Sequence, residues 1–133
     1  MHALIIEDDA ITAMMIENEL RDLGFSTVDT ASTEQEAIEA VARRCPDLVT
    51  SDGSLSHGSG VGAVRKIRAV CCVPVIFLTG DPDHARNCIP DAPVIAKPFS
   101  ISQLVAAIEA ARPPSARHYA RQHASCRPVR ART

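Results

Sequence analysis

The 133-residue chain has few aromatic side chains and no long apolar run. It contains no Trp, one Tyr and three Phe, while 46% of its residues are hydrophobic. Aliphatic side chains must therefore fill the interior, and the length suits one domain with one core. No apolar stretch approaches the roughly 20 residues that a membrane span needs. Because Met1-His2-Ala3 leads directly into an expected strand, we predict no signal peptide and a cytoplasmic location.

Cysteines with a diagnostic spacing are also missing. The chain has five cysteines, an odd number, and none of them forms a Cys-x-x-Cys pair. They are Cys45, Cys71, Cys72, Cys88 and Cys126. This pattern indicates neither a disulfide framework nor a zinc site. We therefore expect reduced cysteines that behave as small apolar residues.

Acidic residues are absent from the end of the chain. Residues 1–112 hold 9 Lys+Arg and all 16 Asp+Glu, a charge of −7, whereas residues 113–133 hold five Arg, a charge of +5. No apolar periodicity follows Pro113-Pro114, so we expect a folded domain over 1–112 and a disordered basic tail over 113–133. The tail would be a solubilising end, would dock on an acidic surface, or would contact nucleic acid, for which its single aromatic, Tyr119, is a weak signal.

Strand and helix patterns alternate along the first 112 residues. Short apolar runs between turn-forming residues predict buried strands over 3–6, 25–31, 47–52, 74–79 and 93–96. Near-helical apolar spacing predicts helices over 11–23, 33–42, 61–70 and 104–111. Gly24 is a stop signal, Thr33 with Glu36 reads as a capping box, and Ser100 or Ser102 would cap the last helix. The alternation predicts an α/β fold in which helices cover both faces of a parallel sheet.

Three carboxylates stand where two of the predicted strands end. Glu7 and Asp8 follow the first strand, and Asp52 ends the third. In parallel sheets ligands bind beyond the carboxyl ends of the strands, so we expect these side chains to form one site. Carboxylates gathered there cannot all stay ionised without a counter-charge, and Mg²⁺ is the simplest one. Asp9 is better placed as the N-cap of the following helix than as a ligand.

The same edge of the sheet carries groups suited to phosphoryl transfer. The metal would bind Asp8 directly, Glu7 directly or through a water, one oxygen of Asp52 and the backbone carbonyl of Ser54. The free oxygen of Asp52 would then act as a nucleophile and become an aspartyl phosphate. Lys97, at the end of the fifth strand, supplies a positive charge, and Thr79, at the end of the fourth, supplies a hydroxyl. The structural alternatives are that Asp52 caps a helix and that Thr79 only fills a strand.

These motifs, in this order, resemble the receiver domains of bacterial response regulators over residues 3–112. The matching segments are Leu4-Ile5-Ile6-Glu7-Asp8-Asp9, Pro46-Asp47-Leu48-Val49-Thr50-Ser51-Asp52, Ser59-Gly60, Pro74-Val75-Ile76-Phe77-Leu78-Thr79-Gly80 and Lys97-Pro98-Phe99. The resemblance implies a single doubly wound, flavodoxin-like sheet of five strands in the order 2-1-3-4-5. It also implies Asp52 as phosphoacceptor, Glu7 and Asp8 as the metal pair, Thr79 as switch hydroxyl, Lys97 as phosphate contact and a cis peptide before Pro98.

The chain departs from the family pattern in three places. Val94 stands where many receivers have Tyr or Phe, and Ser56 stands where Pro is common. Residues 80–92 are about one helical turn shorter than in many relatives and should hold only one or two helical turns. The first and third departures concern the route by which phosphorylation reaches an output surface. His57 lies in the loop after Asp52 and could contact the phosphate, but it is expected to be solvated, as is His84.

We therefore expect a stand-alone response regulator that takes a phosphoryl group from a histidine kinase or a phosphotransfer protein. It would signal through protein–protein contact or relay, as a monomer or weak homodimer without a membrane partner, and would be no enzyme beyond its own phosphotransfer and autodephosphorylation. By family analogy, the fourth helix, fifth strand and fifth helix would form the output surface. Two alternatives are a receiver-like binding module that ignores phosphate and a DNA-associated factor that acts through residues 113–133.

Overall fold

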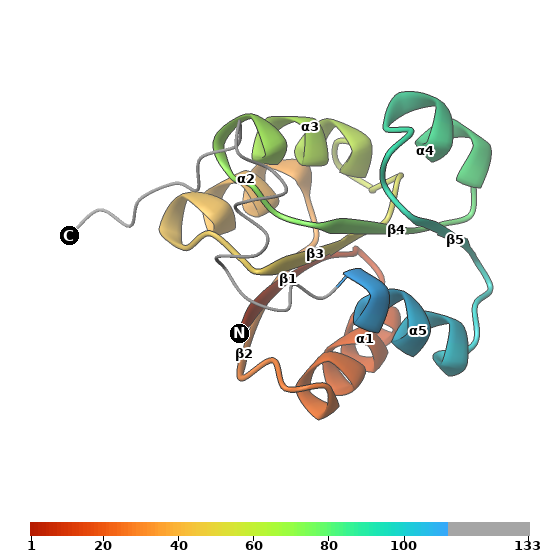
Figure 1. Ribbon diagram of the computed structural model, residues 1–133. Coiled ribbons are helices and arrows are strands. Elements are labelled where there is room, and N and C mark those ends of the chain that lie inside the picture. Colours follow the sequence, from red (N-terminus) through yellow and green to blue (C-terminus); the bar gives the residue numbers. More distant parts are fainter. Residues whose placement is uncertain (112–133) are drawn as a thin grey trace.

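The computed structural model describes residues 1–111 as one α/β fold, and the predicted basic tail, residues 113–133, lies outside this part. Five parallel strands form one sheet in the order β2-β1-β3-β4-β5, with helices on both faces (Figure 1). The strands are β1 (His2–Ile6), β2 (Thr27–Ala31), β3 (Leu48–Ser51), β4 (Val75–Thr79) and β5 (Val94–Ala96). The helices are α1 (Ala10–Asp22), α2 (Glu34–Arg43), α3 (Gly60–Val70), α4 (Pro82–Cys88) and α5 (Ile101–Ala111). The predicted fold class and strand order are confirmed.

Each central strand sends alternate side chains into two separate cores. Leu4 and Ile6 of β1 pack with α2, α3 and α4, whereas Ala3 and Ile5 pack with α1 and α5. This follows from the two-residue period of a strand, and it explains why the central strands read as continuous apolar runs. Figure 1 shows α1 and α5 together on one face of the sheet and α2, α3 and α4 on the other.

The helix ends agree with the predicted caps. The Asp9 side chain accepts from the Thr12 amide at the start of α1, and the Thr33 hydroxyl accepts from the Glu36 amide at the start of α2. The Glu36 carboxylate reaches back to the amide of Ser32, one residue earlier than in an ideal capping box. Of the two serines considered for α5, Ser100 is the cap, since its hydroxyl accepts from the Gln103 amide.

The predicted strands differ from the observed ones only at their ends. Phe25 lies outside β2, although it is buried in the core, because the chain enters the sheet at Thr27. The strands β3, β4 and β5 are each one or two residues shorter than predicted. The segment 80–92 contains a single short helix, α4, as expected. The peptide bond between Lys97 and Pro98 is cis, which agrees with the family resemblance.

The prediction that all cysteines are reduced is wrong, because Cys45 and Cys71 form a disulfide with Cα atoms 6.3 Å apart. Cys45 follows α2, and Cys71 is the C-cap of α3. The two helices pack side by side, and this brings together cysteines that are 26 positions apart in the sequence. The number and spacing of cysteines in the sequence do not show which of them the fold brings into contact. Within residues 1–111, no helix is both long and apolar enough to span a membrane.

Candidate functional site

The register of the sheet brings the predicted acidic residues together. Ile6 of β1 pairs with Ser51 of β3, so Glu7 and Asp52 are the first residues beyond two adjacent strand ends. The Asp52 amide donates to the Ile6 carbonyl oxygen at 2.9 Å, which fixes the start of the following loop. Glu7, Asp8 and Asp52 each offer one carboxylate oxygen, and these atoms all lie within 4.8 Å of one another. We call these three side chains the acidic cluster. Its formation confirms the predicted convergence.

Lys97 reaches the acidic cluster from the end of β5. Thr79 pairs with Ala96, and the Lys97 amide donates to the Thr79 carbonyl oxygen at 2.8 Å, so the lysine leaves β5 level with the end of β4. Its Nζ lies 2.6 Å from Glu7 Oε1 and 3.0 Å from Asp52 Oδ2. One ammonium therefore bridges two members of the cluster.

Burial and the lysine set the charge state of this region. Glu7 is 3% exposed, and this burial raises the pKa of its carboxyl group even though the hydrogen bond and charge of Lys97 oppose the shift. For Lys97 itself, burial lowers the pKa of the ammonium, but hydrogen bonds and charges from Glu7 and Asp52 outweigh it and the net shift is upward. The bridge thus keeps the lysine charged beside a carboxyl group that is costly to ionise.

Asp8 is the exposed member of the cluster and has a partner that the sequence did not indicate. The amide and the hydroxyl of Ser56 both donate to Asp8 Oδ2, at 2.8 and 2.6 Å. The hydrogen bond from the Ser56 hydroxyl is the main cause that lowers the pKa of the Asp8 carboxyl group. The replacement of a common Pro by Ser56 was visible in the sequence. The contact itself depends on the path of the loop between β3 and α3.

Thr79 and Ser54 lie next to the acidic cluster. Thr79 is buried, and its Oγ1 accepts from the Asp81 amide at 3.0 Å. The Ser54 amide donates to Asp52 Oδ1 at 3.3 Å, which places the backbone of this residue beside the carboxylate. The two Asp52 oxygens therefore have different partners, Ser54 on one and Lys97 on the other.

The residues predicted to be peripheral have other surroundings. The side chains of His57 and His84 are exposed, as expected, and the backbone carbonyl of His57 accepts from the Glu34 amide. Val94 is half-buried and packs against the core that α2, α3 and α4 share with the sheet. The sequence did not point to Glu34, whose carboxylate accepts from the Ser59 amide in the loop that follows Asp52.

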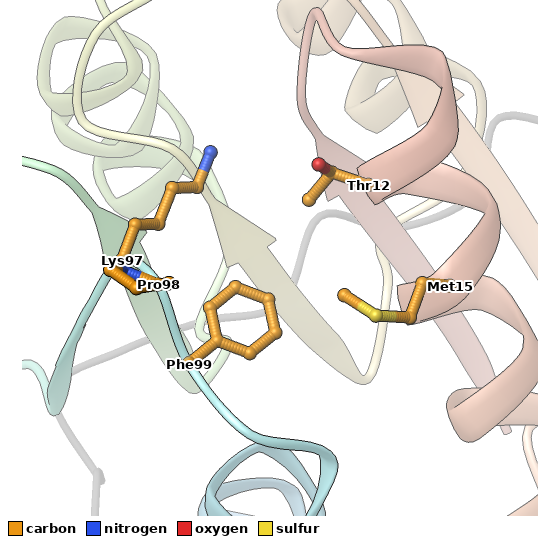
Figure 2. A pocket seen from close by; sticks show the side chains of 5 residues that line it. All are labelled: Thr12, Met15, Lys97, Pro98 and Phe99. Atoms are coloured by element: carbon orange, nitrogen blue, oxygen red, sulfur yellow. The ribbon is translucent and has the colours of Figure 1, made fainter.

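A pocket of about 400 Å³ opens beside Lys97, between the start of α1 and the segment after β5. It is lined by Thr12, Met15, Lys97, Pro98 and Phe99. Figure 2 shows Thr12 and Met15 on α1 facing Phe99 across this pocket, with the Lys97 ammonium at its upper side. Lys97, which contacts the acidic cluster, is thus also accessible to solvent through this pocket.

Comparisons with known proteins agree with this geometry. Residues 3–109 match the response regulator receiver domain family. The chain is 35% identical over 113 residues to the transcriptional regulatory protein PdtaR of Mycobacterium tuberculosis, a match that covers 81% of this chain and 55% of the relative. It is also 35% identical to the phyllosphere-induced regulator PhyR of Methylorubrum extorquens, with 81% and 42% covered. The chain thus spans about half the length of the curated relatives it matches.

Solved structures give the same result. The receiver domain of the PhyR response regulator from Erythrobacter litoralis superposes with a TM-score of 0.77 at 36% identity, covering 86% of this chain and 95% of that domain. PhyR from Brucella abortus superposes with a TM-score of 0.75 at 30% identity, covering 93% and 50%. With the strand order and the clustered carboxylates, these matches establish that the chain belongs to the response regulator receiver domain family.

Proposed function

We propose that this chain is a Mg²⁺-dependent phosphoacceptor of two-component signalling and that Asp52 receives the phosphoryl group. One observation carries the proposal: Asp52 stands at the end of the central strand β3, with Lys97 Nζ 3.0 Å from one of its oxygens and two further carboxylates beside it. A carboxylate in contact with both a fixed cation and other carboxylates is placed to accept a phosphoryl group, because such transfer depends mostly on positioning and charge.

The donor set fits a hard divalent cation. When all are ionised, the three carboxylates of the acidic cluster and the Lys97 ammonium leave a net charge of −2. Oxygen ligands of this kind suit Mg²⁺, which Glu7, Asp8 and Asp52 would hold together with the backbone carbonyl of Ser54. When bound, the ion would supply neutralisation of the negative charge that gathers during phosphoryl transfer.

In the proposed reaction, a carboxylate oxygen of Asp52 attacks the phosphorus atom of a phosphohistidine on a histidine kinase or phosphotransfer protein. The new P–O bond forms as the P–N bond breaks, and the electron pair of the P–N bond stays on the donor imidazole. Lys97 would then contact a phosphoryl oxygen. Because the Thr79 hydroxyl accepts from the Asp81 amide, its own hydrogen is free to be donated to a second one.

For output we propose protein–protein contact or onward phosphotransfer from a cytoplasmic receiver. One structural relative, PhyR from Bartonella quintana, is described as an anti-anti-sigma factor. The half-buried valine at position 94 cannot signal by rotation of an aromatic ring, so the change that follows phosphorylation would have to use other groups of the β4–α4 region.

Acetyl phosphate with Mg²⁺ tests the phosphoacceptor. We expect the intact mass of wild-type protein to increase by one phosphoryl group, and Asp52→Asn to prevent this increase because an amide is not a competent nucleophile. Asp83→Asn, at an exposed position of α4, is the matched control and should be labelled like the wild type. Labelling of Asp52→Asn to the wild-type extent would disprove the assignment.

A receiver-like module that binds its partner without phosphate is the second candidate, and Val94 and the seven-residue α4 favour it. The two functions differ in one measurable property. If phosphorylation is the signal, a beryllium fluoride mimic with Mg²⁺ should change the affinity of the wild-type chain for its partner. It should not change the affinity of Asp52→Asn.

A further inference from the structure

The loop between β3 and α3 is held in place at three points. Ser54 and Ser59 form an antiparallel bridge across its base. The carboxylate of Glu34, at the start of α2, accepts from the Ser59 amide at 3.0 Å. At the tip of the loop, Ser56 contacts Asp8. We call Glu34, Ser54, Ser56 and Ser59 the loop latch.

The contact between Ser56 and Asp8 constrains one carboxylate of the acidic cluster. Two donors from the same residue reach a single oxygen, Oδ2, at 2.8 and 2.6 Å. Hydrogen bonds to an ionised acceptor are about twice as strong as neutral ones, and two of them from different directions restrict rotation of the carboxylate. The position of Asp8 therefore depends on a residue 48 positions away in the sequence.

Glu34 fixes the other end of the same loop. Besides the Ser59 amide, its carboxylate pairs with Lys66 Nζ at 3.0 Å, and its backbone amide donates to the His57 carbonyl at 3.3 Å. Gly58 has a φ of 91°, and a Cβ atom there would lie 2.6 Å from the Glu34 Cβ. The loop thus packs directly on the first turn of α2, and only glycine permits this approach.

We propose that Ser56 is a positioning residue for cation binding at the acidic cluster, and that Glu34 supports it by holding the loop. The proposal rests on the function proposed above, since the cation is the one expected at Glu7, Asp8 and Asp52. Ser56 holds one oxygen of Asp8 and leaves Oδ1 for the cation, and groups that orient metal ligands in this way typically contribute about 10- to 100-fold to metal affinity. Because Ser56 is exposed, we expect the lower end of that range.

Isothermal titration with MgCl₂ tests the role of Ser56 through four variants. Ser56→Ala removes the hydroxyl and should weaken Mg²⁺ binding about tenfold. Ser56→Pro removes both donors, because proline has no amide hydrogen, and should weaken binding further. Ser56→Thr keeps both donors and should bind within about threefold of the wild type. Ser102→Ala replaces an exposed serine on α5 and serves as the matched control.

A second pair of variants separates the hydrogen bond that Glu34 accepts from the effect of its negative charge. Glu34→Gln removes the negative charge but retains an oxygen that can accept from the Ser59 amide, whereas Glu34→Ala removes both. The proposal expects Glu34→Ala to bind Mg²⁺ at least about threefold more weakly than Glu34→Gln. Equal affinities would show that the hydrogen bond to the Ser59 amide does not contribute and would overturn the part of Glu34 in the proposal.

The outcomes for the wild type and for Ser56 are distinguishable. If the wild type binds no Mg²⁺, the proposed function fails and the role of Ser56 fails with it. If the wild type binds Mg²⁺ and Ser56→Ala and Ser56→Pro bind it equally well, only the role of Ser56 is disproved. Thermal unfolding without Mg²⁺ is the folding control. Each variant should unfold at the wild-type temperature, because a lower melting temperature would mean that the substitution damages the fold and not only the cation site.

Discussion

The Lys97 ammonium lies 2.6 Å from Oε1 of Glu7, and this contact joins residues that are 90 positions apart in the sequence. It occupies one oxygen of a carboxylate that we assign to a divalent cation. Lysine and cation therefore repel each other and compete for the same carboxylate. The Lys97 ammonium would contact the phosphoryl group after transfer. The same positive charge disfavours binding of the Mg²⁺ ion that would assist the transfer.

Lys97→Met is expected to strengthen Mg²⁺ binding and to slow phosphoryl labelling. Removal of one positive charge from contact with Glu7 and Asp52 should tighten Mg²⁺ binding by about tenfold or more, as charges at this distance interact strongly. Titration calorimetry measures the first effect, and the rate of labelling by acetyl phosphate measures the second. Arg21→Met, at the far end of α1, is the control for net charge. Unchanged or weaker Mg²⁺ binding would contradict the competition.

Gly60→Ala should destabilise the fold and displace the loop after Asp52. A Cβ atom at Gly60 would collide with the backbone carbonyl of Asp52, and backbone has less freedom to move than a side-chain tip. Alanine favours a helix by about 1 kcal/mol over glycine, but overpacking costs about 1–3 kcal/mol. Urea unfolding should show a net loss of up to about 2 kcal/mol. Gly80→Ala, where nothing lies within 4 Å of the added atom, should show no loss.

Reduction of the Cys45–Cys71 disulfide should lower the stability of the domain. The bond closes a segment of 26 positions, and a loop of this length corresponds to about 2–4 kcal/mol of unfolding free energy. Chemical unfolding with and without a thiol reductant measures the difference. A Cys45→Ala, Cys71→Ala double variant should no longer respond to the reductant. A wild type that unfolds at the same denaturant concentration in both conditions would exclude a contribution of this bond.

Protonation of His2 should destabilise the fold as the pH falls below 6.5. Burial and the charge of Arg44 lower the pKa of the His2 imidazole, and the nearby Asp29 and Asp47 only partly oppose this shift. The unfolded chain therefore binds the proton more readily, so stability is complete above pH 6.5 and is lost as the pH falls through the lower pKa of the folded state. In His2→Gln, the plot of unfolding free energy against pH should be flatter in this window. An unchanged slope would contradict the prediction.

Most of the fold and the centre of the site followed from the order of short patterns. Glu7, Asp52 and Lys97 could be placed together because each ends a strand, and parallel strand ends share one edge. The ends of the strands differ from the predicted ones by one or two residues. Phe25 reads as part of a strand because it is apolar, but it fills the core from the turn that precedes β2.

Features that depend on the path of a loop or the end of a helix were not predictable. The disulfide required α2 and α3 to end side by side, which no spacing of cysteines records. The contact of Ser56 with Asp8 depends on the turn at Gly58 and on the support from Glu34. In both cases the local sequence is compatible with many geometries, and tertiary packing selects one.

The shortness of α4 makes the helices that precede and follow β5 unequal in length. Its seven residues extend only about 10 Å, roughly two helical turns, whereas the eleven residues of α5 extend about 16 Å. Of the two helices, α5 offers the longer surface, and its Ile101 is 51% exposed. The two helices therefore present unequal lengths of surface, and the longer one carries an exposed apolar side chain.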